Sequence, residues 1–136
     1  MNQAATATQS VIVERNLPHP PEKIWRALTQ PHLIEEWLMK ADFKPVLDHR
    51  FSLQADWGTV QCQVTAIDPN KSLAYRWDAL GIETVVTWTL TPTPSGTHLR
   101  MEQTGFRPDQ KQAYHGARHG WPAFFDKLEQ VLARPD

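Results

Sequence analysis

From Arg50 onwards, apolar residues recur at every second position through five successive segments. In each segment apolar residues alternate with polar ones, over residues 51–56, 60–66, 73–78, 85–90 and 99–103. Turn-forming residues separate the segments, as in the DPN and PTPSG stretches. Alternation with short connections is typical of antiparallel strands that bury one face. The pattern therefore predicts an antiparallel meander of five strands.

The period lengthens to that of a helix in the last part of the chain, between Asp109 and Ala133. There, apolar residues at spacings of three and four form a stripe, which consists of Tyr114, Ala117, Trp121, Phe124, Phe125, Leu128, Val131 and Leu132. This spacing predicts an amphipathic helix, roughly 35 Å long at 1.5 Å per residue and so able to cross a small sheet. Pro122 lies inside the stripe and predicts a kink or a restart of the helix near Gly120 and Trp121.

The N-terminal part of the chain combines a strand with two short helices. The stretch SVIVERNL is β-branched at its start and ends at Pro18, so it predicts a first strand. Pro21 and Pro31 each open a short stretch with an apolar face, and proline is favourable in the first turn of a helix. With the meander, these elements predict an α+β domain. A curved six-stranded antiparallel sheet wraps around a long C-terminal helix, and two short helices lie between the first and second strands.

Length, charge and cysteine content limit the class of protein. A chain of 136 residues fits one domain, which we expect over residues 11–136 after a disordered tail over residues 1–10. Lys and Arg total 14 against 15 for Asp and Glu, which argues against a nucleic-acid binder and against a polybasic membrane-surface module. No stretch is apolar enough to span a membrane, and the N-terminus lacks the features of a signal peptide. We therefore expect a cytoplasmic protein.

The sequence offers no readable catalytic or metal-binding constellation. His115 and His119 are four residues apart, but HGARH lacks the glutamate of the H-E-x-x-H arrangement, so we expect no metal. Cys62 is the single cysteine, which excludes an internal disulfide, and it lies on the apolar phase of its segment as a small buried hydrophobe. The serines lack the glycines of a nucleophile elbow. The sequence thus predicts no cofactor and favours a function without catalysis.

Four stretches carry a resemblance to a known family: VERNLPHPPEKIWRALTQPHLIEEWL, VTAIDPNKSLAYRW, VVTWTLTPTPSGTHLRMEQTGF and HGWPAFFDKLEQVL. In this order, from about Val11 to Leu132, the chain resembles the Bet v 1/START-like (SRPBCC) superfamily. Within it, the chain is most similar to the bacterial branch related to the C-terminal domain of the Hsp90 ATPase activator. The first stretch, with W-x-A-L-T-x-P, and the last, with glycine and tryptophan at a helix, are the most specific. The resemblance implies the helix-grip fold, which hosts binders, cyclases and co-chaperone domains.

A helix laid across a curved sheet need not touch all of it, so the implied fold can leave a cavity between the two. The residues that face inward on the predicted strands and helices should line this cavity. They are Trp37, Tyr75, Trp77, Val86, Trp88, Met101, Gln103, Trp121 and Phe125. Flat aromatic rings, one adaptable methionine and one amide suit a ligand pocket. The same rings could equally fill the space as core, and Gln103 could bond to a neighbouring Tyr, Trp or water. Both alternatives stay open at the level of the sequence.

Three functional hypotheses follow. The leading one is non-catalytic binding of a small apolar or aromatic molecule, which burial would hold and Gln103 and the indole N–H groups would orient. The second is a co-chaperone-like module that contacts an Hsp90-type chaperone, although the larger N-terminal domain of the eukaryotic activator has no counterpart in 136 residues. The third is an enzyme of the polyketide cyclase/aromatase kind, since such members of the superfamily use few strong acid–base groups.

Overall fold

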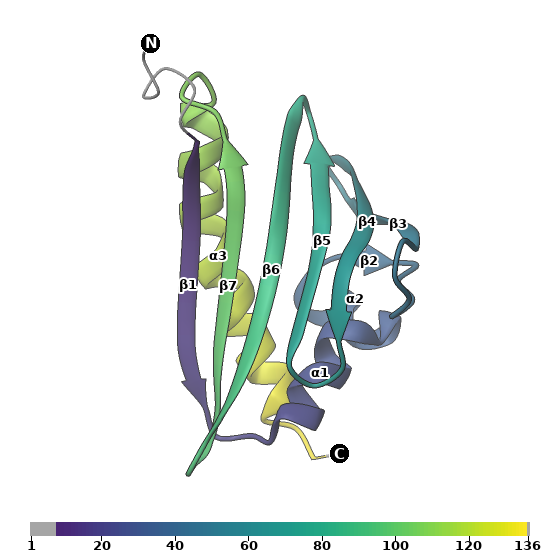
Figure 1. Ribbon diagram of the computed structural model, residues 1–136, viewed down its shortest axis with the longest axis vertical. Coiled ribbons are helices and arrows are strands. Elements are labelled where there is room, and N and C mark those ends of the chain that lie inside the picture. Colours follow the sequence, from purple (N-terminus) through teal and green to yellow (C-terminus); the bar gives the residue numbers. More distant parts are fainter. Residues whose placement is uncertain (1–7, 136) are drawn as a thin grey trace.

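In the computed structural model, which describes residues 8–135, seven antiparallel strands form one sheet and three helices lie against one of its faces (Figure 1). The strands are β1 (Gln9–Leu17), β2 (Lys40–Ala41), β3 (Arg50–Ala55), β4 (Gly58–Asp68), β5 (Ser72–Ala79), β6 (Ile82–Thr93) and β7 (Gly96–Phe106). The helices are α1 (Pro21–Thr29), α2 (Pro31–Trp37) and α3 (Lys111–Leu132). Of the tail predicted over residues 1–10, residues 1–7 lie outside the described residues. Gln9 and Ser10 belong to β1.

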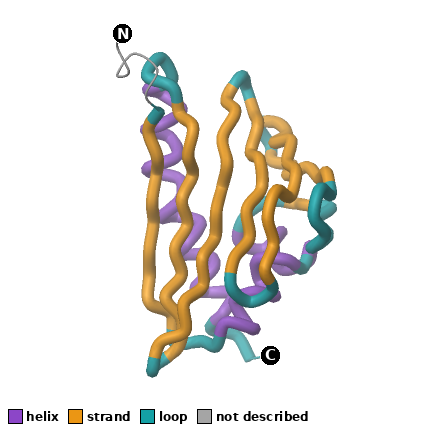
Figure 2. The backbone as a smooth tube through the Cα atoms, in the orientation of Figure 1, coloured by secondary structure: helices purple, strands orange, loops and turns teal. Residues whose placement is uncertain are grey.

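The strand order is β1-β7-β6-β5-β4-β3-β2, so every strand from β2 to β7 lies beside its neighbour in the chain (Figure 2). The predicted fold class is confirmed: an α+β domain with an antiparallel meander, a long C-terminal helix and two short helices after the first strand. The strand count differs from the prediction of six. The additional strand, β2, pairs only Lys40 with Gln54 and Ala41 with Leu53, and two residues are too few to show an alternation.

A proline begins each of the two short helices, and the second proline separates α2 from α1. Pro21 and Pro31 each occupy the first turn of a helix, where no intrahelical N–H is needed. The residue before Pro31 is Gln30, which is extended (φ −92°, ψ 121°) because the proline ring disfavours the helical conformation there. The chain therefore turns at Gln30, and the buried faces of the two short helices, which include Ile24 and Ile34, both reach the core.

Of the two outcomes predicted at Pro122, a kink or a restart, the restart is wrong, because helix α3 runs without interruption through this residue. A proline removes one helical hydrogen bond, and contacts from the first strand hold the helix at this point. Arg15 of β1 donates to the carbonyl oxygen of Pro122 at 3.3 Å and pairs with Asp126 at 2.7 Å and Glu129 at 2.5 Å. Its guanidinium also lies over the ring of Phe125, 5.4 Å from the centroid. One arginine thus links β1 to the turns of α3 that follow the proline.

The strand register brings the inward-facing residues into rows across the sheet. Gln103 of β7 is opposite Val86 of β6, and Val86 is opposite Tyr75 of β5. In the next row, Met101 is opposite Trp88. Cross-strand partners share a face of the sheet, so these five predicted residues lie together under the helices, and all five are at most 5% exposed.

Candidate ligand-binding site

The centre of the space between sheet and helices is filled by aromatic rings. Trp88 of β6 is fully buried, and it touches Trp37 of α2 edge-on, with the ring centroids 5.7 Å apart. It also contacts two rings of α3: Phe125 in a stacked arrangement and Trp121 edge-on, each with its centroid at 5.7 Å. Rings at these separations are in close contact. The middle of the predicted cavity is therefore packed core.

The indole N–H groups of this cluster all donate to protein acceptors. The bonds run from Trp37 Nε1 to the Ala27 carbonyl oxygen (2.8 Å), from Trp88 Nε1 to the Tyr75 hydroxyl (3.0 Å) and from Trp121 Nε1 to Gln103 Oε1 (2.7 Å). Buried indoles usually find such a partner. A ligand would consequently meet the rings of these three residues and not their N–H groups.

The amide of Gln103 belongs to a chain of hydrogen bonds whose directions are fixed. Thr84 Oγ1 donates to the carbonyl oxygen of Trp77 (2.8 Å), and Gln103 Nε2 donates to Thr84 Oγ1 (3.0 Å). A hydroxyl has one proton and an indole nitrogen only donates, so Oε1 must face Trp121 and Nε2 must face Thr84. A primary amide has two N–H bonds and two lone pairs. One N–H and one lone pair of Gln103 therefore lie outside this chain.

A hollow of about 390 Å³ opens beside Gln103, between the N-terminal half of α3 and the strands β5, β6 and β7. We call it the α3 hollow. It is lined by Met39, Trp57, Trp77, Ala79, Leu80, Ile82, Gln103, Phe106, Ala113, Gly116, Ala117, Gly120, Trp121 and Phe124. Two of these side chains are strongly exposed, Trp57 at 55% and Leu80 at 83%, so the mouth of the hollow is apolar as well. Its volume lies within the usual range for small-molecule sites, which is about 300–1,000 Å³.

Two glycines in α3 help to keep the hollow empty. Gly116 and Gly120 both line it, and a Cβ atom added to either would meet no atom within 4 Å. Glycine inside a helix costs roughly 0.5–1 kcal/mol relative to alanine. Neither glycine has the positive φ that would require it on backbone grounds. The helix therefore gives up stability at two positions where a side chain would occupy the space.

The structure divides the nine residues predicted to line a cavity into two groups. Trp77, Gln103 and Trp121 line the α3 hollow. The others, which are Trp37, Tyr75, Val86, Trp88, Met101 and Phe125, are buried in the core cluster next to it. Sequence reasoning did not point to the remaining lining residues, although two glycines four apart within a helical stripe were a usable signal. The two exposed residues at the mouth, Trp57 and Leu80, lie in or beside turns, where no period marks them.

Two ionisable groups lie in the core near the sheet, and neither is suited to chemistry at neutral pH. Burial raises the pKa of the Tyr75 hydroxyl far above its usual range, although the hydrogen bond from Trp88 acts in the opposite direction. Burial also raises the pKa of the Cys62 thiol, and the charges of Asp78 and Asp42 add to the effect. Cys62 is thus a neutral, buried hydrophobe, as its position in the sequence predicts.

A curved antiparallel sheet that clasps a long C-terminal helix is the Bet v 1-like, or SRPBCC, helix-grip architecture. The sequence model of one family within this class matches residues 18–133, and its description is "Activator of Hsp90 ATPase homolog 1-like protein". This match covers most of the chain. The protein therefore belongs to the family of Activator of Hsp90 ATPase homolog 1-like proteins. No curated protein matches the chain.

Several solved structures share this fold. The chain is 62% identical to protein MLL2253 from Mesorhizobium loti, with a TM-score of 0.91 over 94% of this chain and 99% of that one. It is 25% identical to BH1534 from Bacillus halodurans, with a TM-score of 0.83 over 93% of this chain and 99% of that one. DynU16, a protein of the dynemicin biosynthetic locus, is also 25% identical, with a TM-score of 0.81 over 90% of this chain and 46% of that one.

Over residues 8–135, the structure contains no helix that is both long and apolar enough to cross a membrane. Within the same range, no three side chains of the types His, Cys, Asp and Glu come together as a metal site would require.

Proposed function

We propose that this protein binds a small, uncharged aromatic or otherwise apolar molecule in the α3 hollow and does not convert it. The observation that carries the proposal is the hollow itself: an apolar space of about 390 Å³ that adjoins a fully packed core. Small-molecule sites are concave, mostly apolar and furnished with a few polar groups. Trp77, Trp121 and Phe124 supply flat ring surface for such a ligand, and Gln103 supplies the polar group.

The chemistry of the lining favours a ligand without charge. None of the described residues that line the α3 hollow has an ionisable side chain. Transfer of an unpaired charge from water into such a site is strongly unfavourable. A neutral aromatic hydrocarbon does not incur this desolvation cost. Each Å² of its apolar surface that leaves water contributes roughly 25 cal/mol to binding.

Two polar groups are placed to orient the ligand. Gln103 has one N–H and one lone pair outside its hydrogen-bond chain, so it can recognise a hydroxyl or a carbonyl group. The indole N–H of Trp77 makes no hydrogen bond within residues 8–135, and Trp77 lines the hollow. A neutral aromatic molecule with one hydroxyl or carbonyl substituent matches both groups.

The test is intrinsic tryptophan fluorescence against a library of neutral aromatic and lipid-like compounds, because Trp77 and Trp121 line the hollow. We expect at least one compound to perturb the emission below about 100 μM, which corresponds to roughly −5.5 kcal/mol. Ala117→Phe fills the hollow and should abolish this response. Ala123→Phe adds the same ring at an exposed position of the same helix and should preserve it. A library without hits, or a full response in Ala117→Phe, contradicts the proposal.

The family match favours a second candidate, contact with an Hsp90-type chaperone. Its test is a pull-down of the tagged protein with the host chaperone at physiological salt. Recovery of the chaperone supports this function, and its absence from the eluate rules it out at cellular affinity. Ala117→Phe separates the two candidates, because a protein contact on the outer surface does not depend on an empty α3 hollow.

The similarity to DynU16, which belongs to a biosynthetic locus, favours a third candidate, catalysis on a polyketide-like substrate. Such an enzyme would have to work without an acid or base in the lining of the described hollow. The prediction that separates it from binding is loss of turnover in Gln103→Ala with the fold intact. A wild-type protein that leaves polyketide-like substrates unchanged removes this candidate.

A further inference from the structure

Leu80, in the two-residue turn between β5 and β6, combines two features that are each unfavourable for leucine. Its side chain is 83% exposed, the largest value among the exposed large hydrophobic residues over residues 8–135. Its φ of +52° lies in the left-handed region, where the Cβ atom of an L-residue comes too close to the following carbonyl oxygen. Neither core packing nor backbone conformation therefore explains why leucine occupies this turn.

Other positions with a left-handed backbone have the residues expected there. Over residues 8–135, three residues other than glycine have a positive φ, and the other two are Asp48 and Asn70, both at +67°. Asp and Asn tolerate this region because their short polar side chains can form local hydrogen bonds. Two-residue hairpin turns favour Asn-Gly or Asp-Gly, whereas this turn has Leu80 before Gly81. Asparagine at position 80 would suit both the conformation and the exposure better than leucine does.

The turn is held beside the beginning of α3. The hairpin of β5 and β6 reaches the same end of the molecule as the first turn of this helix (Figure 1). Gln110, the N-cap residue of α3, donates from Nε2 to the carbonyl oxygen of Gly81 at 3.2 Å, and its Oε1 accepts the backbone N–H of Arg107 at 3.0 Å. One side chain thus connects the turn to the start of α3, and Leu80 is kept at the mouth of the α3 hollow, which it lines.

A second turn places another exposed apolar side chain at the same mouth. Trp57, between β3 and β4, is 55% exposed and also lines the α3 hollow. Contact of large apolar side chains with water is unfavourable. An apolar ligand that extends from the hollow to its mouth would remove part of Trp57 and Leu80 from water. The unfavourable exposure in the free protein would then become a favourable contribution to binding.

We propose that Leu80 is a ligand-binding residue and that the ligand is elongated, with a neutral aromatic group near Gln103 and an apolar chain that contacts Leu80 and Trp57. This inference rests on the proposed function of the α3 hollow and adds the shape of the ligand to it. The strained, exposed leucine is an outlier at a site that is open to ligand, and such outliers persist where a function requires them. Leu80 thus lowers the stability of the free protein and raises its affinity for long ligands.

The experiment measures the affinities of 4-alkylphenols with chains from ethyl to hexyl, which are uncharged at neutral pH and carry one hydroxyl group. NMR signals of the backbone amides give both the affinity and the location. The affinity of the wild type should rise about two- to fourfold for each methylene group, since a fully buried one contributes about fourfold. In Leu80→Asn, the affinity ratio between the hexyl and ethyl compounds should fall at least about fivefold, while the ethyl compound binds almost as before.

The matched control is Leu47→Asn. Leu47 is also an exposed leucine, at 53%, but it does not line the α3 hollow and its φ is not positive. This variant should leave the affinities unchanged. Thermal unfolding of the unliganded proteins gives an independent readout: Leu80→Asn should raise the midpoint by about 2–4 °C, because asparagine tolerates the left-handed turn, and Leu47→Asn should not. A purely structural role for Leu80 predicts a lower midpoint instead.

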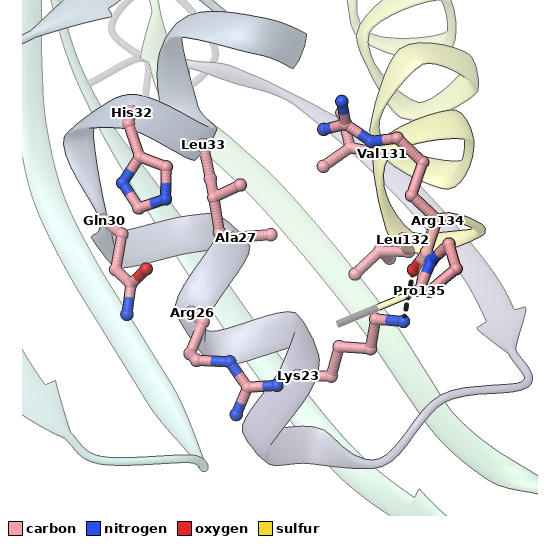
Figure 3. A pocket seen from close by; sticks show the side chains of 10 residues that line it. All are labelled: Lys23, Arg26, Ala27, Gln30, His32, Leu33, Val131, Leu132, Arg134 and Pro135. Carbon is pink, nitrogen blue, oxygen red and sulfur yellow. Dashed lines mark hydrogen bonds between the residues drawn. The ribbon is translucent and has the colours of Figure 1, made fainter.

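A second hollow provides a control within the same molecule. It has a volume of about 480 Å³, lies where the last turn of α3 meets α1 and the start of α2 (Figure 3), and shares no lining residue with the α3 hollow. Its lining includes the apolar side chains of Ala27, Leu33 and Leu132, so it could also take up an alkyl chain without specificity. We expect the amide signals to shift around the α3 hollow and in the turn between β5 and β6, and not at this second hollow.

Three results overturn the proposal: the same dependence on chain length in Leu80→Asn as in the wild type, a lower thermal midpoint of this variant, or equal shifts in both hollows. If no 4-alkylphenol binds the wild type below about 1 mM, the proposed function fails and the role of Leu80 fails with it. If the compounds bind in the α3 hollow with the same affinities in Leu80→Asn, the proposed function stands and only the role of Leu80 fails.

Discussion

The two halves of α3 differ in what they place against the sheet. The C-terminal half contributes Trp121, Phe125, Leu128 and Leu132, and each of these side chains is at most 2% exposed. The N-terminal half, up to Gly120, contributes no fully buried residue: Tyr114 packs edge-on against Phe106 of β7, and small residues line the α3 hollow. Arg15 links β1 to the second half and not to the first. One continuous helix is thus tightly packed over its C-terminal half and borders the α3 hollow over its N-terminal half.

This difference separates fold from function within a single element. The packed half supplies the apolar burial that holds helix and sheet together, so its residues explain why the domain folds. The half with small residues adds little burial and keeps about 390 Å³ open. Substitutions should therefore act on stability in one half and on ligand binding in the other.

The largest expected effect is in the packed half. Trp88→Ala should lower the free energy of unfolding by about 3–5 kcal/mol, because it leaves a cavity among three aromatic neighbours. Urea unfolding followed by circular dichroism measures this loss. Trp57→Ala, at an exposed position on the mouth of the α3 hollow, should change stability by no more than about 0.5 kcal/mol. Similar losses in both variants would erase the distinction between the two regions.

The next effect concerns the buried pair of Tyr75 and Trp88. Tyr75→Phe should cost about 1–3 kcal/mol at neutral pH, because the indole N–H of Trp88 loses its acceptor. Burial raises the pKa of Tyr75 in the folded protein, so the folded state retains a proton that the unfolded state loses above about pH 10. This contribution to stability is complete below that pH and is lost as the pH rises.

The measurement is urea unfolding at a series of pH values from about 7 to about 11.5. This range extends to both sides of the ordinary tyrosine pKa of about 10. The wild-type protein should lose more stability with rising pH than Tyr75→Phe does, and the difference isolates this hydroxyl from other alkaline groups. Parallel pH profiles for the two proteins would mean that Tyr75 ionises normally and that its surroundings are not tightly packed.

A stabilising effect is expected in the half that spans the hollow. Gly116→Ala and Gly120→Ala should each raise the free energy of unfolding by about 0.5–1 kcal/mol, because alanine favours the helix and its methyl group meets no atom within 4 Å. Both variants should bind hollow ligands more weakly. Gly96→Ala is the control: a methyl group there would meet the carbonyl oxygen of Leu17, at a φ of +155°, and should destabilise the protein. Destabilisation by both helix substitutions would show that the glycines have a structural role.

The smallest effect lies at the end of the packed half. Arg134 hydrogen-bonds Glu36 and thereby lowers the pKa of that carboxyl group. A lowered pKa means that the pair stabilises the fold above the ordinary glutamate value of about 4.3, and that this contribution is lost as the pH falls through the folded-state pKa. An NMR titration of Glu36 should show the lowered value in the wild type and a return towards the ordinary one in Arg134→Gln. Lys127→Gln should not move it, and an unchanged titration in Arg134→Gln would exclude the pair.

Much of the architecture could be predicted from local pattern. Alternation gave the meander from β3 to β7, and the three-and-four spacing gave α3, because each pattern spans enough residues to define a period. β2 was missed because two residues define none. Of the kink or restart predicted at Pro122, the restart is wrong, and the contacts of Arg15, 107 residues away in the sequence, are not visible to local reasoning.

The sequence by itself determined which residues face inward, since the phase of a strand or helix follows from its own residues. It did not determine whether those residues would pack against the opposite layer of the fold or leave space between the layers. Trp77 of β5 and Trp88 of β6 both lie on inward phases of two paired strands, four residues apart in register, yet Trp88 is packed core and Trp77 borders empty space. That outcome depends on how far α3 lies from each part of the sheet, and this distance is set jointly by side chains from several elements. Only the tertiary structure therefore decided where the filled core ends and the α3 hollow begins.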